Sequence, residues 1–160
     1  MGLVKTQLEK EPENVDYLLI LGKLSLFAGK NDEALKYIKK AQELNPNKPY
    51  SYTLLAGIYA GLGKTDQAID EYQKLIEANP RLEGAHMALA VLYNAKGDKE
   101  KARQHYKQAL ELNPKFAPAA NNLAWMMAQE KDGDLGEAMR LALVAKETAT
   151  TWWIGGAAVS

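Results

Sequence analysis

The 160-residue chain is 47% hydrophobic and 25% charged, so it can bury a core and remain soluble. Its 20 basic and 20 acidic residues cancel, which removes the overall positive charge typical of proteins that bind nucleic acid or anionic membranes. The absence of cysteine excludes disulfides, zinc fingers, iron–sulfur clusters and thiol catalysis.

A period of 34 residues runs through the sequence. It relates four prolines, three glycines, three alanines and three leucines: Pro12, Pro46, Pro80 and Pro114; Gly29, Gly63 and Gly97; Ala34, Ala68 and Ala102; and Leu21, Leu55 and Leu89. The chain has only six prolines, so chance does not explain four of them at one spacing. The period indicates a stack of similar structural units.

Each recurring residue type has a mechanical role in a pair of helices. Gly22 and the later alanines at its position are small where the first helix approaches the second, and Ala34 and its equivalents serve the same purpose on the second helix. Gly29, Gly63 and Gly97 can adopt the left-handed conformation that ends a first helix. The Asn-Pro pairs, such as Asn45-Pro46, stop the second helix.

This pattern resembles the tetratricopeptide repeat family over residues 12–149. The resemblance implies an all-α fold, a right-handed superhelical solenoid of antiparallel helix pairs. The run Asn121–Met127 also resembles a stretch common in bacterial members of the family, including members attached to envelope assembly and polysaccharide export. We therefore expect a bacterial protein of this family, or a fragment of one.

The predicted elements follow in chain order. Residues 1–14 form the end of a preceding repeat's second helix, because 3–11 lead up to Pro12 without a first helix before them. Four repeats then occupy 15–48, 49–82, 83–116 and 117–149. Their expected helix pairs are 15–28 with 31–44, 49–62 with 65–78, 83–96 with 99–112, and 117–130 with 134–149.

The fourth repeat and the C-terminus depart from the pattern. Gly133 and Ala138 come two residues late, so the turn is longer, and Asp134 with Glu137 has the spacing of a capping box that restarts the helix. Residues 150–160 form an uncharged, apolar tail without repeat pattern. We expect this tail to cap the end of the array, where Ala138, Leu141 and Ala142 offer a surface, or to join a second copy through Trp152, Trp153 and Ile154. The alternative is a disordered tail.

Motifs for catalysis or metal binding are weak. The stretch 57–65 ends like a phosphate-binding loop, but Ile58 replaces its first glycine and the segment joins two helices. His86 and His105 match no local metal spacing, and we expect His86 to be packed and His105 to lie on a solvated face. We therefore predict no enzymatic activity, no catalytic residue, no cofactor and no metal.

The family resemblance implies recognition of a protein or peptide in a concave groove lined by the first helices. The candidate groove residues are Leu19, Lys23, Leu26, Tyr50, Thr53, Gly57, Met87, Val91, Asn94, Asn121 and Trp125. Relatives that bind acidic chaperone tails carry basic residues in successive repeats, a pattern this groove lacks. Its apolar character suits an amphipathic helix or an extended apolar segment, with Met87 and Trp125 as anchors.

The expected partners are proteins or peptides, without nucleic acid and without direct membrane insertion. The alternative function is a structural module that forms a homo-oligomer through its apolar ends and its C-terminal tail. The chain lacks the long apolar stretch of a signal peptide at its start. We expect a cytoplasmic protein or, for a fragment of an exported protein, a periplasmic one.

Overall fold

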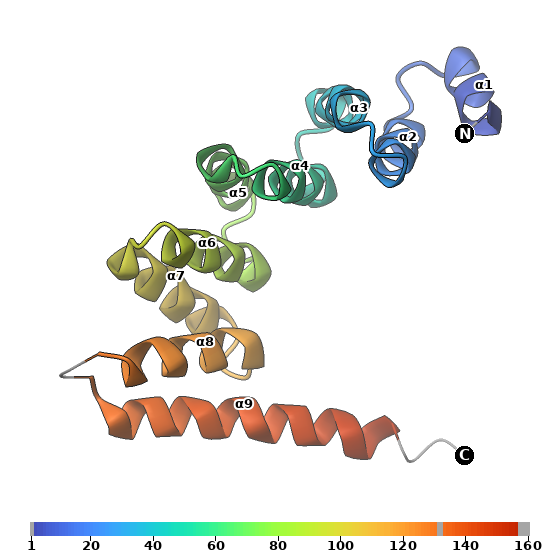
Figure 1. Ribbon diagram of the computed structural model, residues 1–160. Coiled ribbons are helices and arrows are strands. Elements are labelled where there is room, and N and C mark those ends of the chain that lie inside the picture. The colour runs from blue at the N-terminus through green and yellow to red at the C-terminus, as the bar shows by residue number, and fades with distance from the viewer. Residues whose placement is uncertain (1, 131–132, 157–160) are drawn as a thin grey trace. The chain divides into compact units, whose positions relative to one another are not determined.

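The computed structural model describes residues 2–130 and 133–156, with side chains to residue 148. The described residues form helices only, which confirms the all-α fold (Figure 1). The helices are α1 (Gly2–Lys10), α2 (Val15–Phe27), α3 (Asn31–Leu44), α4 (Pro49–Gly61), α5 (Thr65–Ala78), α6 (Glu83–Ala95), α7 (Lys99–Leu112), α8 (Ala117–Ala128) and α9 (Leu135–Gly156).

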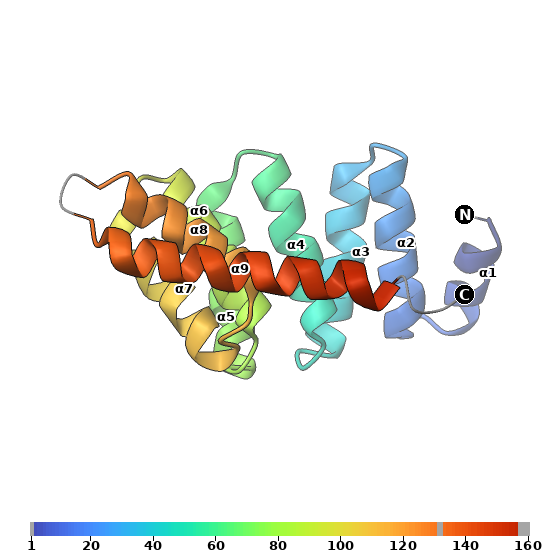
Figure 2. The same cartoon turned by 90° about the horizontal axis from the view of Figure 1, so that it is seen from below.

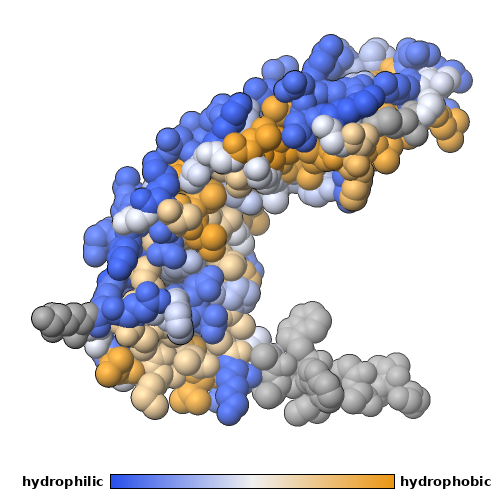
Figure 3. All heavy atoms as spheres, in the orientation of Figure 1, coloured by the Kyte–Doolittle hydropathy of each residue, from blue (hydrophilic) through white to orange (hydrophobic). Residues whose placement is uncertain are grey.

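The helices pack in sequential pairs, as expected for a solenoid. The pairs are α2 with α3, α4 with α5, α6 with α7, and α8 with α9, and α1 packs against α2. Contacts divide the chain into two compact units, Met1–Pro80 with α1 to α5 and Arg81–Ser160 with α6 to α9. In the first unit, hydrophilic side chains gather on the α3 and α5 side, and hydrophobic ones lie towards α2 and α4 (Figure 3).

The three periodic glycines end the first helices as the sequence predicts. Gly29 and Gly63 both have φ of 71°, and Gly97 has φ of 82°, the left-handed region that a side chain disfavours. In each case the amide of the residue after the glycine donates to the carbonyl oxygen five residues earlier, for example Lys30 N to Ser25 O at 2.8 Å. These bonds satisfy carbonyls that the end of the helix would leave unpaired.

The Asn-Pro turns depend on asparagine as well as on proline. The Asn45 side-chain oxygen accepts from Asn47 N at 3.2 Å, and Asn113 accepts from Lys115 N at the same distance. Such a bond to the amide two residues on closes an Asx turn across the intervening proline. The side chain therefore directs the chain from a second helix into the next repeat, while proline prevents the helix from continuing.

The core of each unit consists of the periodic small and leucine positions. Leu21 and Leu55 in the first unit and Leu89 in the second are fully buried. Ala34 and Ala102, where second helices meet first helices, are fully buried as well. Small side chains at these crossings let paired helices approach closely, and the leucines fill the seam between them.

Helix α9 differs from its sequence prediction at both ends. It begins at Leu135 with Asp134 as its N-cap, since the Asp134 carboxylate accepts from Glu137 N at 3.0 Å. The Glu137 side chain pairs with Arg140 instead of reaching back to the cap. The expected end at residue 149 is wrong, because the helix continues to Gly156. Within the described residues, no helix is both long and apolar enough to cross a membrane.

Candidate binding site beside an exposed tryptophan

An exposed tryptophan on α8 borders a hollow within the second unit. The Trp125 side chain is 70% exposed, and Val91 on α6 is 42% exposed. The hollow has a volume of about 220 Å³ and is lined by Val91, Asn94, Lys99, Tyr106, Asn122, Trp125, Met126 and Gln129. A large indole left in water costs free energy, so an exposed tryptophan beside a hollow indicates an interaction site.

Each helix contributes to this hollow through its periodicity. Val91 and Asn94 lie one turn apart on α6, and Trp125 on α8 is followed one turn later by Gln129, the residue that caps the end of this helix. Between them, Asn122 shares a hydrogen bond with Tyr106, which is 2% exposed on α7. Burial raises the pKa of the Tyr106 hydroxyl, so this group stays neutral at physiological pH.

The structure places most of the predicted groove residues on exposed surfaces of first helices. In the second unit, Asn94 and Asn121 are exposed and Met87 is half-buried. In the first unit, exposed or half-buried positions on α2 and α4 are Lys23, Leu26, Tyr50, Thr53 and Gly57. The hollow brings together Val91, Asn94 and Trp125 from the predicted set.

The prediction for Leu19 needs correction. Its side chain is only 4% exposed, so it belongs to the core and is not available to a ligand. The equivalent residue of the next repeat, Thr53, is exposed. The periodic alignment gave both residues the same role, although burial at this position differs between repeats.

A larger hollow of about 460 Å³ lies between α7, α8 and α9, but it does not have the character of a specific site. Its lining includes Leu110 and Pro114, and Leu8 and Pro12 occupy the same positions three repeat lengths earlier. Those two residues line a hollow of about 250 Å³ between α1 and α3. The same repeat positions therefore line a hollow in each of the two units.

The two histidines form a pair that sequence reasoning missed. His86 Nδ1 and His105 Nδ1 are 3.2 Å apart, and the His105 ring stacks on Tyr93 at 5.6 Å between ring centroids. The expectation that His86 is packed is confirmed, since it is 7% exposed. The expectation of a solvated His105 is wrong, because its ring turns towards α6. His105 is half-buried, and Glu71, 34 residues earlier in the repeat, is buried.

The histidine pair predicts a stability that falls in acid. Burial, followed by the nearby His86, lowers the pKa of the His105 imidazole, while Gln108 opposes this effect. The unfolded chain then binds more protons than the folded chain as pH falls through the usual imidazole pKa of about 6.5. We expect the urea midpoint of unfolding to decrease from about pH 8 to about pH 5.5.

Replacing His105 with glutamine should flatten this pH dependence. The matched control is Gln104→His, because Gln104 is the exposed neighbour of His105. Urea unfolding followed by circular dichroism measures both variants. An unchanged slope against pH in His105→Gln would contradict the assignment.

The described residues contain no group of three or more metal-ligating side chains. The hollow beside Trp125 likewise presents amides, one amine and apolar surface, without a nucleophile paired to a base. This arrangement can hold a polypeptide segment by packing and hydrogen bonds.

The helix pairs, periodic glycines and small-residue crossings define a helical repeat protein. Sequence models of the tetratricopeptide repeat match residues 15–48, 49–82, 84–116 and 105–140. The chain belongs to the tetratricopeptide repeat family, whose members are typically non-enzymatic scaffolds for protein interactions.

Similar solved structures are bacterial proteins of this family. A crystal structure of MamA has a TM-score of 0.77 at 26% identity, covering 92% of this chain and 85% of that chain. YrrB, described as a protein with an unusual peptide-binding site, has a TM-score of 0.72 at 19% identity over 91% of this chain and 74% of its own. PilW, described as a type IV pilus biogenesis factor, has a TM-score of 0.71 at 19% identity over 92% and 67%. No curated protein sequence matches the chain.

Proposed function

We propose that this chain is a non-enzymatic scaffold whose second unit binds a peptide or helical segment of a partner protein beside Trp125. The observation that carries the proposal is the 70% exposure of the Trp125 side chain at the edge of a hollow. Tryptophan is enriched among the residues that contribute most to protein interfaces, because it offers a large, rigid area and one hydrogen-bond donor.

The chemistry of the hollow favours a neutral or apolar segment. Asn94, Asn122 and Gln129 can donate to and accept from a peptide backbone, and Val91 and Trp125 can pack on apolar side chains. Lys99 is the one charged residue among the described lining residues. A single amine does not provide the several cations that an acidic tail would need.

The first unit has exposed groove residues of its own. Lys23 and Leu26 on α2 and Tyr50 on α4 supply one positive charge, one apolar side chain and one exposed ring. We propose that these residues form a separate protein-binding surface on the first unit. The peptide-binding site in the description of YrrB supports the same class of ligand for this chain, by likeness of fold.

The proposal predicts that Trp125→Ala weakens binding strongly. Peptides selected from a displayed random library against the full chain provide the probes, and fluorescence anisotropy measures their Kd. Loss of a central tryptophan should raise Kd by about 30-fold or more, which corresponds to about 2 kcal/mol. Leu3→Ala is the matched control, because Leu3 on α1 is also a highly exposed apolar residue.

Two results would overturn the proposal. One is an unchanged Kd for Trp125→Ala with every selected peptide. The other is a loss of binding on changing second-helix residues such as Lys107, with Trp125→Ala bound normally. Both results would move the binding surface away from the first helices of the second unit.

A further inference from the structure

The outer face of α9 carries an exposed apolar stripe, formed by Leu135, Met139 and Leu143. Their side chains are 62%, 69% and 55% exposed, and they follow one another at intervals of four residues. Such intervals place them in one row along the helix. Gly136 and Ala142, also exposed, flank the row with small side chains. In Figure 2, α9 lies in front of α7 and α8, and no other helix of its unit covers this face.

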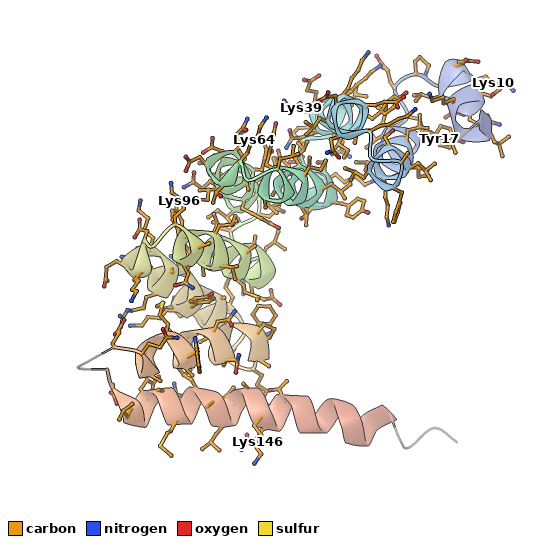
Figure 4. All side chains as sticks on the ribbon, viewed as in Figure 1. Lys10, Tyr17, Lys39, Lys64, Lys96 and Lys146 are labelled. Carbon is orange, nitrogen blue, oxygen red and sulfur yellow. The ribbon has the colours of Figure 1, made fainter. Side chains whose placement is uncertain are left out.

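The apolar end surface expected from the sequence is therefore placed differently. Ala138 and Leu141 are 5% and 4% exposed and pack in the core of the unit, so only Ala142 of the expected surface is exposed. Hydrophobic side chains are visible along the outer edge of α9 in Figure 3. Lys146, one turn beyond Leu143, projects away from α8 (Figure 4), so the described stripe ends in a charged turn.

Earlier repeats show which of these positions a following first helix would cover. The N-caps Lys30, Asp98 and Asp134 fix the alignment of α3, α7 and α9. At the position of Met139, α7 has Arg103, which forms an ion pair with Glu130 and is largely covered. A first helix of a following repeat, packed on α9, would therefore cover Met139 and account for its apolar side chain.

A following first helix would not account for Leu135 and Leu143. At the positions of Leu135 and Leu143, α7 has Lys99 and Lys107, which stay exposed although α8 follows. In the first unit, Asn31 and Lys39 at the same positions are exposed although α4 follows. These positions are polar where a repeat follows and leucine on α9, so the leucines indicate an occupant that covers the full length of the stripe.

The stripe is self-complementary about Met139. When two α9 helices pack antiparallel around a twofold axis at this residue, Met139 meets its own copy. Leu135 meets Leu143 of the second copy, and Gly136 meets Ala142 of the second copy. A symmetric interface needs a surface that matches itself in this way, and the small residues allow the two backbones to approach.

We propose that a second copy of this chain packs on the α9 stripe, so that the protein forms a symmetric antiparallel dimer through Leu135, Met139 and Leu143. The stripe is one row of side chains, smaller than the roughly 800 Å² per partner of a standard stable interface. The dimer is therefore weak and depends on concentration. It is separate from the Trp125 surface on α8, so the two proposals can fail independently.

Sedimentation of the full chain over a wide range of concentration tests the association. Opposite charges introduced at Met139 test whether this residue lies on the twofold axis. Met139→Glu should weaken the dimer by about tenfold or more, because two like charges then face each other. Met139→Lys should do the same for the same reason. An equimolar mixture of the two variants should associate again, because opposite charges meet at the axis.

Cysteine pairs test the register, since the chain has no cysteine of its own. Met139→Cys should form a disulfide with its own copy under mild oxidation. Leu135→Cys and Leu143→Cys should each cross-link poorly alone and well when mixed, because disulfides need closely spaced Cα atoms. Gln104→Cys, at an exposed position on α7, is the matched control.

Three results would overturn the proposal. They are a chain that stays monomeric at all concentrations, a Glu and Lys mixture that associates no better than either variant alone, and cross-linking through Met139→Cys no greater than through Gln104→Cys. Trp125→Ala should leave all three measurements unchanged, which separates this dimer from the proposed peptide site.

Discussion

Replacing Gly133 with alanine is expected to lower the free energy of unfolding of the second unit by about 2–3 kcal/mol. A Cβ at this position would lie 2.0 Å from the Met127 carbonyl oxygen and 3.2 Å from the Glu130 carbonyl oxygen. Both are backbone atoms, so no side-chain rotation relieves the overlap. The backbone must therefore move, and this movement displaces either the end of α8 or the N-cap Asp134, which holds the first turn of α9.

Urea unfolding followed by circular dichroism measures this loss. The matched control is Gly84→Ala, because Gly84 is an exposed helical glycine whose added Cβ meets nothing within 4 Å. That control should be neutral or stabilising by up to about 1 kcal/mol, through the higher helix propensity of alanine. Equal stability of the two variants would show that the turn before α9 tolerates a side chain at Gly133.

The repeated elements of the fold could be predicted because each depends on a residue with a narrow physical role. Gly29, Gly63 and Gly97 adopt the left-handed conformation that their position requires. Ala34 and its equivalents are buried where two helices cross. These requirements are local, so a single sequence with internal copies reveals them without any knowledge of the remaining contacts.

Features that depend on neighbouring helices could not be predicted in the same way. His105 lies between polar residues in the sequence, yet its ring packs on Tyr93 of the paired helix. Leu19 shares its repeat position with the exposed Thr53, yet it is buried. Periodicity identifies the face of a helix, whereas the depth of each side chain depends on the particular residues packed against it.

The candidate site also combines a residue that the sequence predicts with residues that only the packing of neighbouring helices reveals. Trp125 could be selected from the sequence because a large ring stands at a position of a first helix that the repeat pattern assigns to the concave groove, and it is highly exposed in the structure. The hollow beside it also requires Tyr106 and Lys99 from α7, which the alignment of first helices did not include. The side chains of Trp152, Trp153 and Ile154 lie outside the described residues, so their role in self-association remains a prediction.

Gly22 lies where α2 closely approaches α3, and Gly22→Ala is expected to lower the free energy of unfolding of the first unit by about 1–3 kcal/mol. The added Cβ would lie 2.4 Å from Ile38 Cγ1 and 3.1 Å from Ile38 Cδ1. The higher helix propensity of alanine offsets only part of this overlap. The next repeat has the buried Ala56 at the position of Gly22 and Tyr72 at the position of Ile38, so we expect the requirement for glycine to be specific to the pairing with Ile38.

A double-mutant cycle tests whether Ile38 is the cause. Ile38→Ala alone should cost about 2–5 kcal/mol through the cavity that it leaves. In the double variant, the alanine at residue 22 occupies part of that cavity, so the total should be smaller than the sum of the single losses by about 1 kcal/mol or more. Gly57→Ala, on the exposed side of α4 with nothing within 4 Å of its Cβ, is the matched control and should not couple to Ile38→Ala. Strict additivity for Gly22 and Ile38 would mean that the backbone of α2, and not this side-chain contact, requires glycine at residue 22.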